Sequence, residues 1–321
     1  MMDATSGDDA PRVSVVLPVF NEAGHLHEEI TRIRAGLEAA GLDHEIIVVD
    51  DGSTDGSSER LRDIEDIRLV QYGNNRGSGF ARRAGSAVAR GDVVVWTDVD
   101  MTYPNERIPE LVAALDGHDQ VVGARTSEEG AVKLFRVPAK WTIRKMAEFL
   151  AGQKIPDLNS GMRAFRREVL VQFLHLMPNG FSHVTTATMT FLANNYSVGY
   201  VPIDYATRHG TSKFHWLKDT QRYMTQVARM IMLYQPLRIF LPAALLLLGV
   251  GFAKLVYDVA TRDFAVAINT VVLLLSGGSL VILGLVADLV VQLNKSSQHV
   301  DPAAFKVREP TARPRRTSRI S

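Results

Sequence analysis

The chain has 321 residues, with 36 Lys and Arg against 35 Asp and Glu, and no Cys. The absence of Cys excludes disulfide scaffolds, thiolate metal sites and cysteine nucleophiles. A net charge of +1 argues against a general nucleic-acid-binding protein, which would carry a strong basic excess. The mean hydropathy of +0.01 averages a polar first part and an apolar last part. The length allows one large domain or two ordinary ones.

The first part of the chain alternates between short apolar runs and segments with helical spacing. Residues 1–11 precede this pattern; they are small and acidic, lack the regions of a signal peptide, and are expected to be disordered. The apolar runs, rich in Val and Ile, lie at 13–19, 45–49, 67–70, 92–96 and 120–122. The helical segments between them lie at 22–40, 56–65, 79–90 and 106–116. This alternation predicts an α/β fold with a mostly parallel sheet, in which ligands bind beyond the carboxyl ends of the strands.

Two long apolar stretches follow near the end of the chain. Residues 239–253 carry no charge, the run continues to about residue 260, and residues 264–287 also carry none. A helix needs about 20 apolar residues to cross a membrane. The rest of the sequence cannot cover both stretches in a soluble core. We therefore predict transmembrane helices at about 239–260 and 264–290, joined by a loop at 258–263 that holds Asp258.

Basic segments flank the apolar stretches. Residues 131–151 and 215–235 mix large apolar side chains with Lys and Arg, which indicates amphipathic helices at a membrane interface; helices packed on the sheet with a solvated basic face are the alternative. Both outer flanks are more basic than the connecting loop, so the positive-inside rule places both termini in the cytoplasm. The tail at 294–321 is rich in Pro, Arg and Ser, and we expect it to be disordered.

Carboxylates follow two of the predicted strands. The sequence DDGSTD at 50–55 suits hydrogen bonds to a base and a ribose, although an ordinary turn with an Asp or Ser helix cap fits the same residues. Asp98 and Asp100 end the strand at 92–97. Alternate strand residues point the same way, so both carboxylates can approach one hard cation, whereas many such pairs are solvated turns.

A glycine-rich loop, GNNRGSGFARRAG at 73–85, leads into a predicted helix. Such a loop can cradle a phosphate at the helix N-terminus. It does not match a dinucleotide-binding fingerprint, because Arg82 occupies the third glycine position and the loop follows the third strand instead of the first.

As a set, these motifs resemble the nucleotide-sugar domain of glycosyltransferase family 2, which has the GT-A fold. The motifs that carry the resemblance are PVFNE at 18–22, VVDDGSTDGS at 48–57, NNRGSGFARRAG at 74–85 and GDVVVWTDVD at 91–100. Two later motifs, DLNSGMR at 157–163 and RHGTSK at 208–213, are similar to elements of the polyprenyl-phosphate branch, the dolichol-phosphate mannose synthase-like enzymes. Bacterial members with two C-terminal transmembrane helices share this layout.

The resemblance implies a domain order and a reaction. A GT-A domain at 12–235 would precede two transmembrane helices within 236–293 of a multi-pass inner-membrane protein. The enzyme would move a sugar, with inversion, from a nucleotide sugar to membrane polyprenyl phosphate on the cytoplasmic face. A UDP-sugar such as UDP-glucose is favoured, because two-span bacterial relatives often use one, and GDP-mannose is the alternative.

The resemblance also assigns roles to residues. The nucleotide sugar would be bound by Pro18, Asn21, Glu22, Asp50, Asp51, Arg76, Asp98, Ser212 and Lys213. Mg²⁺ or Mn²⁺ on the diphosphate would be held by Asp98 and Asp100. The catalytic residues would be Asp100, Asp157 and Arg208, with Asp157 acting as a base, a metal ligand or an orienting group. The acceptor phosphate would be bound by Arg125, Arg163, Lys133 and Arg136, for which surface charge or ion pairing is the alternative.

The chemistry of such a transfer agrees with these residue types. A nucleoside diphosphate leaving group develops charge that a divalent cation and Arg or Lys donors can stabilise. A lipid phosphate with a second pKa near 6 is mostly ionised at neutral pH, so a strong general base is not needed.

Three other functions agree less well with the sequence. A non-catalytic membrane adaptor would have no need of the intact Asp and Arg motifs. A processive polysaccharide synthase usually carries a Q-x-x-R-W element and more spans, and a nicotinamide dehydrogenase would need the dinucleotide fingerprint. Small residues at 276–284 allow close helix packing, so a homo-oligomer is compatible with the sequence.

Overall fold

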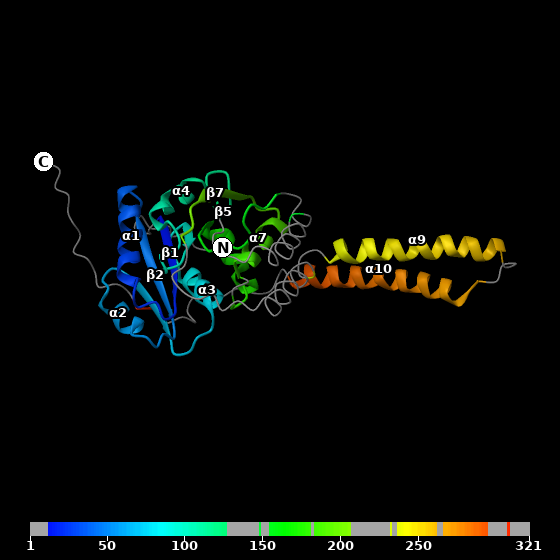
Figure 1. Ribbon diagram of the computed structural model, residues 1–321, viewed down its shortest axis with the longest axis horizontal. Helices are drawn as coiled ribbons and strands as arrows, with labels where there is room; N and C mark the ends of the chain where they lie inside the picture. The colour runs from blue at the N-terminus through cyan, green and yellow to red at the C-terminus, as the bar shows by residue number, and fades with distance from the viewer. Residues whose placement is uncertain are drawn as a thin grey trace, which may run out of the picture. The chain divides into compact units, whose positions relative to one another are not determined.

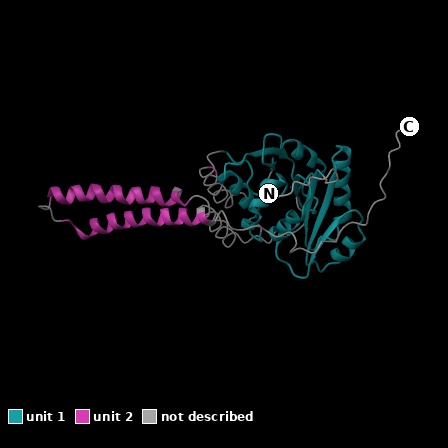
Figure 2. Cartoon of the chain, turned by 180° about the vertical axis from the view of Figure 1, so that it is seen from behind, with its two compact units in different colours: residues 1–138, 154–214, 299–321 teal, residues 139–153, 215–298 magenta. Residues whose placement is uncertain are grey.

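A computed structural model of the chain describes residues 12–126, 148, 154–180, 183–206, 232, 236–261, 266–294 and 307–308. The chain forms two compact units, shown in different colours in Figure 2. The first unit takes in residues 1–138, 154–214 and 299–321, and the second takes in residues 139–153 and 215–298. The expected helices near 131–151 and 215–235 lie almost wholly outside the described residues.

The first unit is built on one mixed sheet with the strand order β7-β5-β6-β4-β1-β2-β3-β8. The strands are β1 (Val13–Val19), β2 (His44–Asp51), β3 (Arg68–Tyr72), β4 (Val93–Trp96), β5 (Gln120–Arg125), β6 (Arg163–Arg166), β7 (Val198–Ile203) and β8 (Val307–Arg308). Strands β4, β1, β2 and β3 run parallel, as do β5 and β7. β6 is antiparallel to β4 and β5, and β8 is antiparallel to β3. The expected α/β fold with a mostly parallel sheet is confirmed.

Helices cover both faces of this sheet (Figure 1). They are α1 (Leu26–Ala39), α2 (Ser57–Asp63), α3 (Ser78–Val88), α4 (Ile108–Ala113), α6 (Arg167–Phe173) and α7 (His183–Ala193), with short 3₁₀ turns at Asn105–Arg107 and Leu174–Leu176. The packing of β1 explains why its sequence is apolar at every position except Ser14. Val15 and Leu17 pack into the core that contains α1 and α4, whereas Val16 packs into the core that contains α3 and α7. Successive strand residues face opposite sides, so a strand covered on both faces is a continuous apolar run.

Three strands lie where no apolar run marks the sequence. β6 begins with the charged Arg163, and β7 contains Gly199 and Pro202, both of which are uncommon inside strands. β8 lies in the tail that we expected to be disordered; Val307 and Arg308 pair with β3 at the sheet edge.

The second unit contains two long helices, α9 (Leu237–Thr261) and α10 (Ile268–Asn294). Both are long and apolar enough to cross a membrane, with spans at Ile239–Thr261 and Ile268–Val291. Only 11% and 17% of their most apolar windows are buried, and Leu246 is 68% exposed. A core helix of a soluble protein would instead be mostly buried. The two apolar C-terminal helices predicted from the sequence are therefore present, although α10 starts at 268 instead of 264.

Close packing and one polar cluster join α9 to α10. A Cβ on Gly277 would lie 2.7 Å from Leu248 Cγ, so glycine allows the two helices to approach there. We expected Asp258 in the connecting loop. It lies instead in the last turn of α9. Its carboxylate is buried and accepts hydrogen bonds from Thr270 Oγ1 at 2.5 Å and the Ala267 backbone N–H at 3.1 Å. A homo-oligomer through 276–284 stays a prediction.

Candidate active site

The first strands of the sheet bring two predicted binding segments together. β1 and β2 end side by side, with Val19 paired to Asp50. Asn21 follows β1 with a left-handed backbone, φ 59°, and its Oδ1 accepts the Thr54 N–H at 2.8 Å. The Glu22 N–H donates to Ser57 Oγ at 3.1 Å. The loop after β1 is thus tied to the 50–55 turn, as the sequence led us to expect, and Pro18 is half-buried at the end of β1.

The first two carboxylates of the 50–55 segment, Asp50 and Asp51, are almost fully buried and bind the chain itself. Asp50 accepts the Ser53 N–H at 3.1 Å and also the Ser58 hydroxyl. Asp51 accepts the backbone N–H groups of Arg76 at 2.9 Å and Gly77 at 2.7 Å. Burial raises the pKa of Asp51 above its ordinary value, because it outweighs these hydrogen bonds. Both carboxylates hold loops in place, as expected if the segment is an ordinary turn that caps a helix. Contact of either carboxylate with a nucleoside stays a prediction.

The chain itself occupies the N-terminus of α3, where the glycine-rich sequence allowed a phosphate cradle. At the N-terminus of α3, the N–H groups of Gly79 and Phe80 donate to the Asn179 carbonyl at 2.8 and 3.3 Å. A Cβ on Gly79 would lie 2.1 Å from the Pro178 carbonyl oxygen, so this approach requires glycine. An anion site at a helix N-terminus needs free N–H groups, and here the chain itself occupies them. Arg76 is exposed, and its guanidinium lies over the Phe80 ring at 4.9 Å.

Asp98 and Asp100 follow β4 and remain partly exposed. Asp98 Oδ1 accepts Arg82 Nη2 at 2.6 Å, and Asp100 Oδ1 accepts the Thr102 hydroxyl at 2.5 Å. The part of the chain that the structure describes contains no group of three or more Asp, Glu, His or Cys that could hold a metal ion. Two carboxylates are nevertheless the protein ligands that Mg²⁺ usually takes when substrate phosphates supply others. The donor set of Asp98 and Asp100 therefore fits a divalent cation bound together with a diphosphate.

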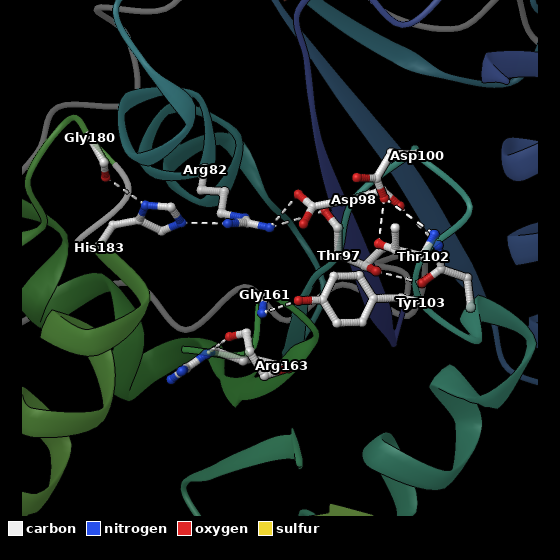
Figure 3. A network of polar contacts seen from close by, with 12 residues as sticks. Arg82, Thr97, Asp98, Asp100, Thr102, Tyr103, Gly161, Arg163, Gly180 and His183 are labelled. Carbon is white, nitrogen blue, oxygen red and sulfur yellow. Dashed lines mark hydrogen bonds and ion pairs between the residues drawn. The ribbon is translucent and has the colours of Figure 1, made fainter. Parts of the chain in front are cut away.

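A network of polar contacts surrounds Asp98, as Figure 3 shows. Arg82 reaches it from α3, and His183, the first residue of α7, contacts the other side of the same guanidinium. Burial and the charge of Arg82 hold the pKa of His183 well below its ordinary value, so the ring is neutral. The Tyr103 hydroxyl oxygen accepts the Gly161 N–H at 2.7 Å. We had assigned no role to Arg82 or Tyr103, because they lie far apart in the sequence and match no spacing pattern.

Asp157 and Arg125 form a two-pronged ion pair. Arg125 Nε lies 2.7 Å from Asp157 Oδ2, and Arg125 Nη2 lies 3.0 Å from Oδ1. Burial would raise the pKa of Asp157, but the hydrogen bonds and charge of Arg125 outweigh it and hold this pKa below its ordinary value. A carboxylate with a lowered pKa is a poor base, so this geometry argues against the base role of Asp157, whereas the metal-ligand and orienting roles stay predictions.

Arg163 lies elsewhere than the acceptor role requires. Its side chain is fully buried and donates to the carbonyls of Ser160 at 2.7 Å and Leu158 at 3.0 Å, and to the Thr188 hydroxyl. Burial lowers the pKa of Arg163 to about 10. The side chain thus supports the 157–163 segment from inside the fold, and a lipid phosphate could reach it only if it left the core.

Five predicted site residues lie outside the described residues. They are Lys133, Arg136, Arg208, Ser212 and Lys213. The site described here therefore consists of the ends of β1, β2 and β4, together with Asp157 and Arg125.

Two family models match the chain. The model of glycosyl transferase family 2 matches residues 14–174, which include all the strand-end motifs described above. The model of the GtrB C-terminal hairpin matches residues 235–293, which include α9 and α10.

Curated relatives match over most of the chain. An undecaprenyl-phosphate 4-deoxy-4-formamido-L-arabinose transferase of Pectobacterium carotovorum is 37% identical over 220 residues, 66% of this chain and 65% of that protein. An enzyme of the same name from Aeromonas hydrophila is 32% identical over 253 residues, 76% of this chain and 74% of that protein. The chain thus spans slightly less than two thirds of the first relative and about three quarters of the second.

The fold also occurs among solved structures. A crystal structure of glucosyl-3-phosphoglycerate synthase from Mycobacterium tuberculosis in complex with Mn²⁺, UDP-glucose and phosphoglyceric acid matches with a TM-score of 0.53. The match covers 68% of this chain and 79% of that chain, at 22% identity. At this identity the likeness shows a common fold.

Proposed function

Because the chain belongs to glycosyltransferase family 2, we propose that it transfers a sugar, with inversion, from a nucleotide sugar to a membrane polyprenyl phosphate. One observation carries the proposal: a single chain combines partly exposed Asp98 and Asp100 at a strand end with two apolar helices. The carboxylates suit a metal-bound diphosphate, and the helices suit an acceptor whose prenyl chain stays in the bilayer. The names of the curated relatives, which are undecaprenyl-phosphate sugar transferases, support the same acceptor class.

The described residues have distinct parts in this reaction. Asp98 and Asp100 would hold Mg²⁺ or Mn²⁺, which neutralises charge on the diphosphate leaving group when bound. The lipid phosphate is mostly ionised at neutral pH, so it attacks the sugar without a strong base. The ion pair between Asp157 and Arg125 then orients the site without removing a proton.

The donor that we propose is a UDP-sugar, with UDP-glucose first and GDP-mannose as the alternative. The solved neighbour binds UDP-glucose with Mn²⁺, which supports a UDP-sugar on this fold. The sugar in the relatives' names, 4-deoxy-4-formamido-L-arabinose, adds a further donor to test.

The proposed location is the inner membrane, with the first unit on the cytoplasmic side. The match to a hairpin family over α9 and α10 supports membrane insertion. The basic flanks of the hairpin support the orientation.

The test is sugar transfer by membranes that contain the overexpressed chain. Polyprenyl phosphate and Mn²⁺ are supplied, labelled UDP-glucose, GDP-mannose and the UDP-linked formamido-arabinose are offered separately, and label is counted in the organic phase with and without EDTA. We expect label that depends on both the donor and the metal ion. An absence of lipid-soluble label from every donor, with the protein folded and inserted, would reject the proposal in favour of a membrane adaptor.

A further inference from the structure

We propose that Arg82 is a positioning residue for Asp98: with His183 behind it, Arg82 fixes the carboxylate in the orientation that receives the metal ion. The inference rests on the proposed function, since that function gives Asp98 a metal ion to bind. It concerns residues of α3 and α7, which lie beside the D-x-D pair in space but far from it in sequence.

Arg82 is a buried charge with a specific set of partners. Its side chain is 3% exposed. Nη2 donates to Asp98 Oδ1 at 2.6 Å and to the Thr97 carbonyl at 3.4 Å, and the guanidinium lies 5.8 Å from the centre of the Trp96 ring. Burying a guanidinium is costly unless close partners compensate. This cost makes the orientation of Arg82 and the position of Asp98 depend on each other.

His183 determines which way the guanidinium of Arg82 points. Its Nδ1 lies 2.8 Å from the Gly180 carbonyl oxygen. A carbonyl only accepts hydrogen bonds, so Nδ1 carries the proton and Nε2 is left as an acceptor for Arg82 Nη1. Figure 3 shows the resulting line of contacts from Gly180 through His183 and Arg82 to Asp98.

Gly161 lies close to both Asp98 and Arg82. A Cβ on Gly161 would lie 2.9 Å from Asp98 Oδ2, 3.0 Å from Arg82 Nη2 and 3.2 Å from the Tyr103 hydroxyl. Asp98 Oδ1 thus accepts from Arg82, and Asp98 Oδ2 lies where a side chain at position 161 would reach it. The side chain of Asp98 is still one-third exposed. The carboxylate is therefore oriented by Arg82 and remains accessible to a ligand.

A carboxylate held in this way is a prepared metal ligand. Carboxylates that bind metal ions are usually hydrogen-bonded by further residues, and loss of such a partner typically weakens metal binding about 10–100-fold. Arg83 offers a matched control. It is the next residue on α3, and it donates to the Met177 carbonyl and to Asn179 Oδ1, both at 3.1 Å, and these bonds do not involve Asp98.

The experiment measures Mn²⁺ binding without turnover. The full-length chain is purified in detergent with UDP, free Mn²⁺ is followed by electron paramagnetic resonance, and thermal unfolding is recorded for each variant. Arg82→Lys keeps the charge but loses the planar two-pronged donor, and we expect Mn²⁺ to bind at least about tenfold more weakly. Arg83→Lys should bind Mn²⁺ as the wild type does.

Variants of His183 test the same line of contacts if Arg82→Lys does not fold. His183→Gln keeps an oxygen that can accept from Arg82, whereas His183→Leu removes the acceptor. We expect Mn²⁺ binding to weaken more in His183→Leu than in His183→Gln, and the half-saturating Mn²⁺ concentration for sugar transfer to rise in the same order.

Each outcome separates this inference from the proposed function. Wild-type Mn²⁺ binding by folded Arg82→Lys, or equal weakening in Arg83→Lys, would overturn the positioning role and leave the sugar transfer untouched. A wild-type chain that binds Mn²⁺ with UDP in an Arg82-dependent manner, yet labels no lipid, would support the positioning role and reject the proposed acceptor.

Discussion

The two units of this chain each contain a carboxylate that is held by partners from other parts of the fold. In the first unit, Asp98 is bound by Arg82 and stays one-third exposed. In the second unit, Asp258 is fully buried and accepts hydrogen bonds from Thr270 and the Ala267 N–H at the start of α10. Both are Asp residues near the end of a strand or helix. The sequence around each predicts that the strand or helix ends in a polar residue, but it does not predict the partners of that residue.

The difference lies in what remains accessible after the hydrogen bonds are made. Asp98 remains partly exposed just after a strand, so a ligand can still bind to its carboxylate. Asp258 has no exposed surface, and its partners are the neighbouring turns of a helical hairpin, so its hydrogen bonds join α9 to α10. Held but accessible carboxylates are candidates for chemistry, and fully enclosed ones are candidates for assembly of the fold. The following predictions test this distinction.

Replacement of the accessible carboxylates should produce the largest effect. Asp100→Asn keeps an oxygen for the Thr102 hydroxyl but removes a charge that a cation needs. We expect sugar transfer to fall on the order of 10²–10³-fold, the range found when a group that stabilises transition-state charge is lost, with unchanged thermal unfolding. Asp116→Asn, at an exposed position after α4, is the control for charge alone. An active Asp100→Asn variant would contradict the assignment of the metal site.

A methyl group next to Asp98 should have the next largest effect. Gly161→Ala places a Cβ 2.9 Å from Asp98 Oδ2, and such overpacking typically costs about 1–3 kcal/mol. We expect Mn²⁺ binding and sugar transfer to fall about tenfold as the carboxylate shifts. Gly24→Ala, where a Cβ would meet no atom within 4 Å, is the control. Equal activity of the two variants would show that the orientation of Asp98 is unimportant.

The enclosed carboxylate should affect stability and not catalysis. Thr270→Val keeps the shape of the side chain but removes the hydroxyl that donates to Asp258, and hydrogen bonds between membrane helices are worth about 0.6–2 kcal/mol. We expect the hairpin to unfold more easily in detergent while sugar transfer is retained. Thr261→Val removes only a bond to Tyr257 on the same helix and is the control. Loss of transfer with an equally stable hairpin would place Asp258 among the functional residues.

The smallest effect should be a dependence of stability on pH. Because the pKa of Asp157 is lowered in the folded chain, its ion pair with Arg125 stabilises the fold above the unfolded pKa near 4. This contribution should disappear as the pH falls below about 4 and through the folded pKa. Thermal unfolding of wild type and Asp157→Asn between pH 3 and 7 measures it. The difference between the two proteins should shrink toward the acid end, and a constant difference would contradict the shift.

The sequence predicted the parts of the fold that depend on neighbouring residues. Runs of Val and Ile located β1 to β5, and the carboxylates at the end of β2 and just after β4 marked where these strands end. β6 was missed because Arg163, its first residue, is a buried charge held by carbonyls, and no local pattern marks a charge as buried. The occupation of the N-terminus of α3 could not be read from the local sequence for a related reason. The Asn179 carbonyl, which takes the N–H groups of α3, comes from a segment about 100 residues further along the chain.

The candidate site shows the same division. Asp98 and Asp100 stand out in the sequence as two carboxylates directly after an apolar run, although β4 ends at Trp96 and the alternation of side chains along a strand does not extend to them. Arg82 and His183 do not stand out in this way, because their roles arise from a contact between α3 and α7. Charge and hydrogen-bonding capacity can be read from a residue type, but its partners depend on the tertiary fold.

The two-residue strand β8 also bears on the proposed membrane location. Val307 pairs with Val70, so the chain leaves the sheet, forms the helical hairpin and then returns to the edge of the same sheet. Backbone hydrogen bonds between neighbouring strands span less than 5 Å, whereas the apolar layer of a membrane is about 30 Å thick. Strands on opposite sides of a membrane cannot pair. The pairing of β8 with β3 therefore agrees with the proposed location, in which the two helices α9 and α10 cross the membrane and return the chain to the same side.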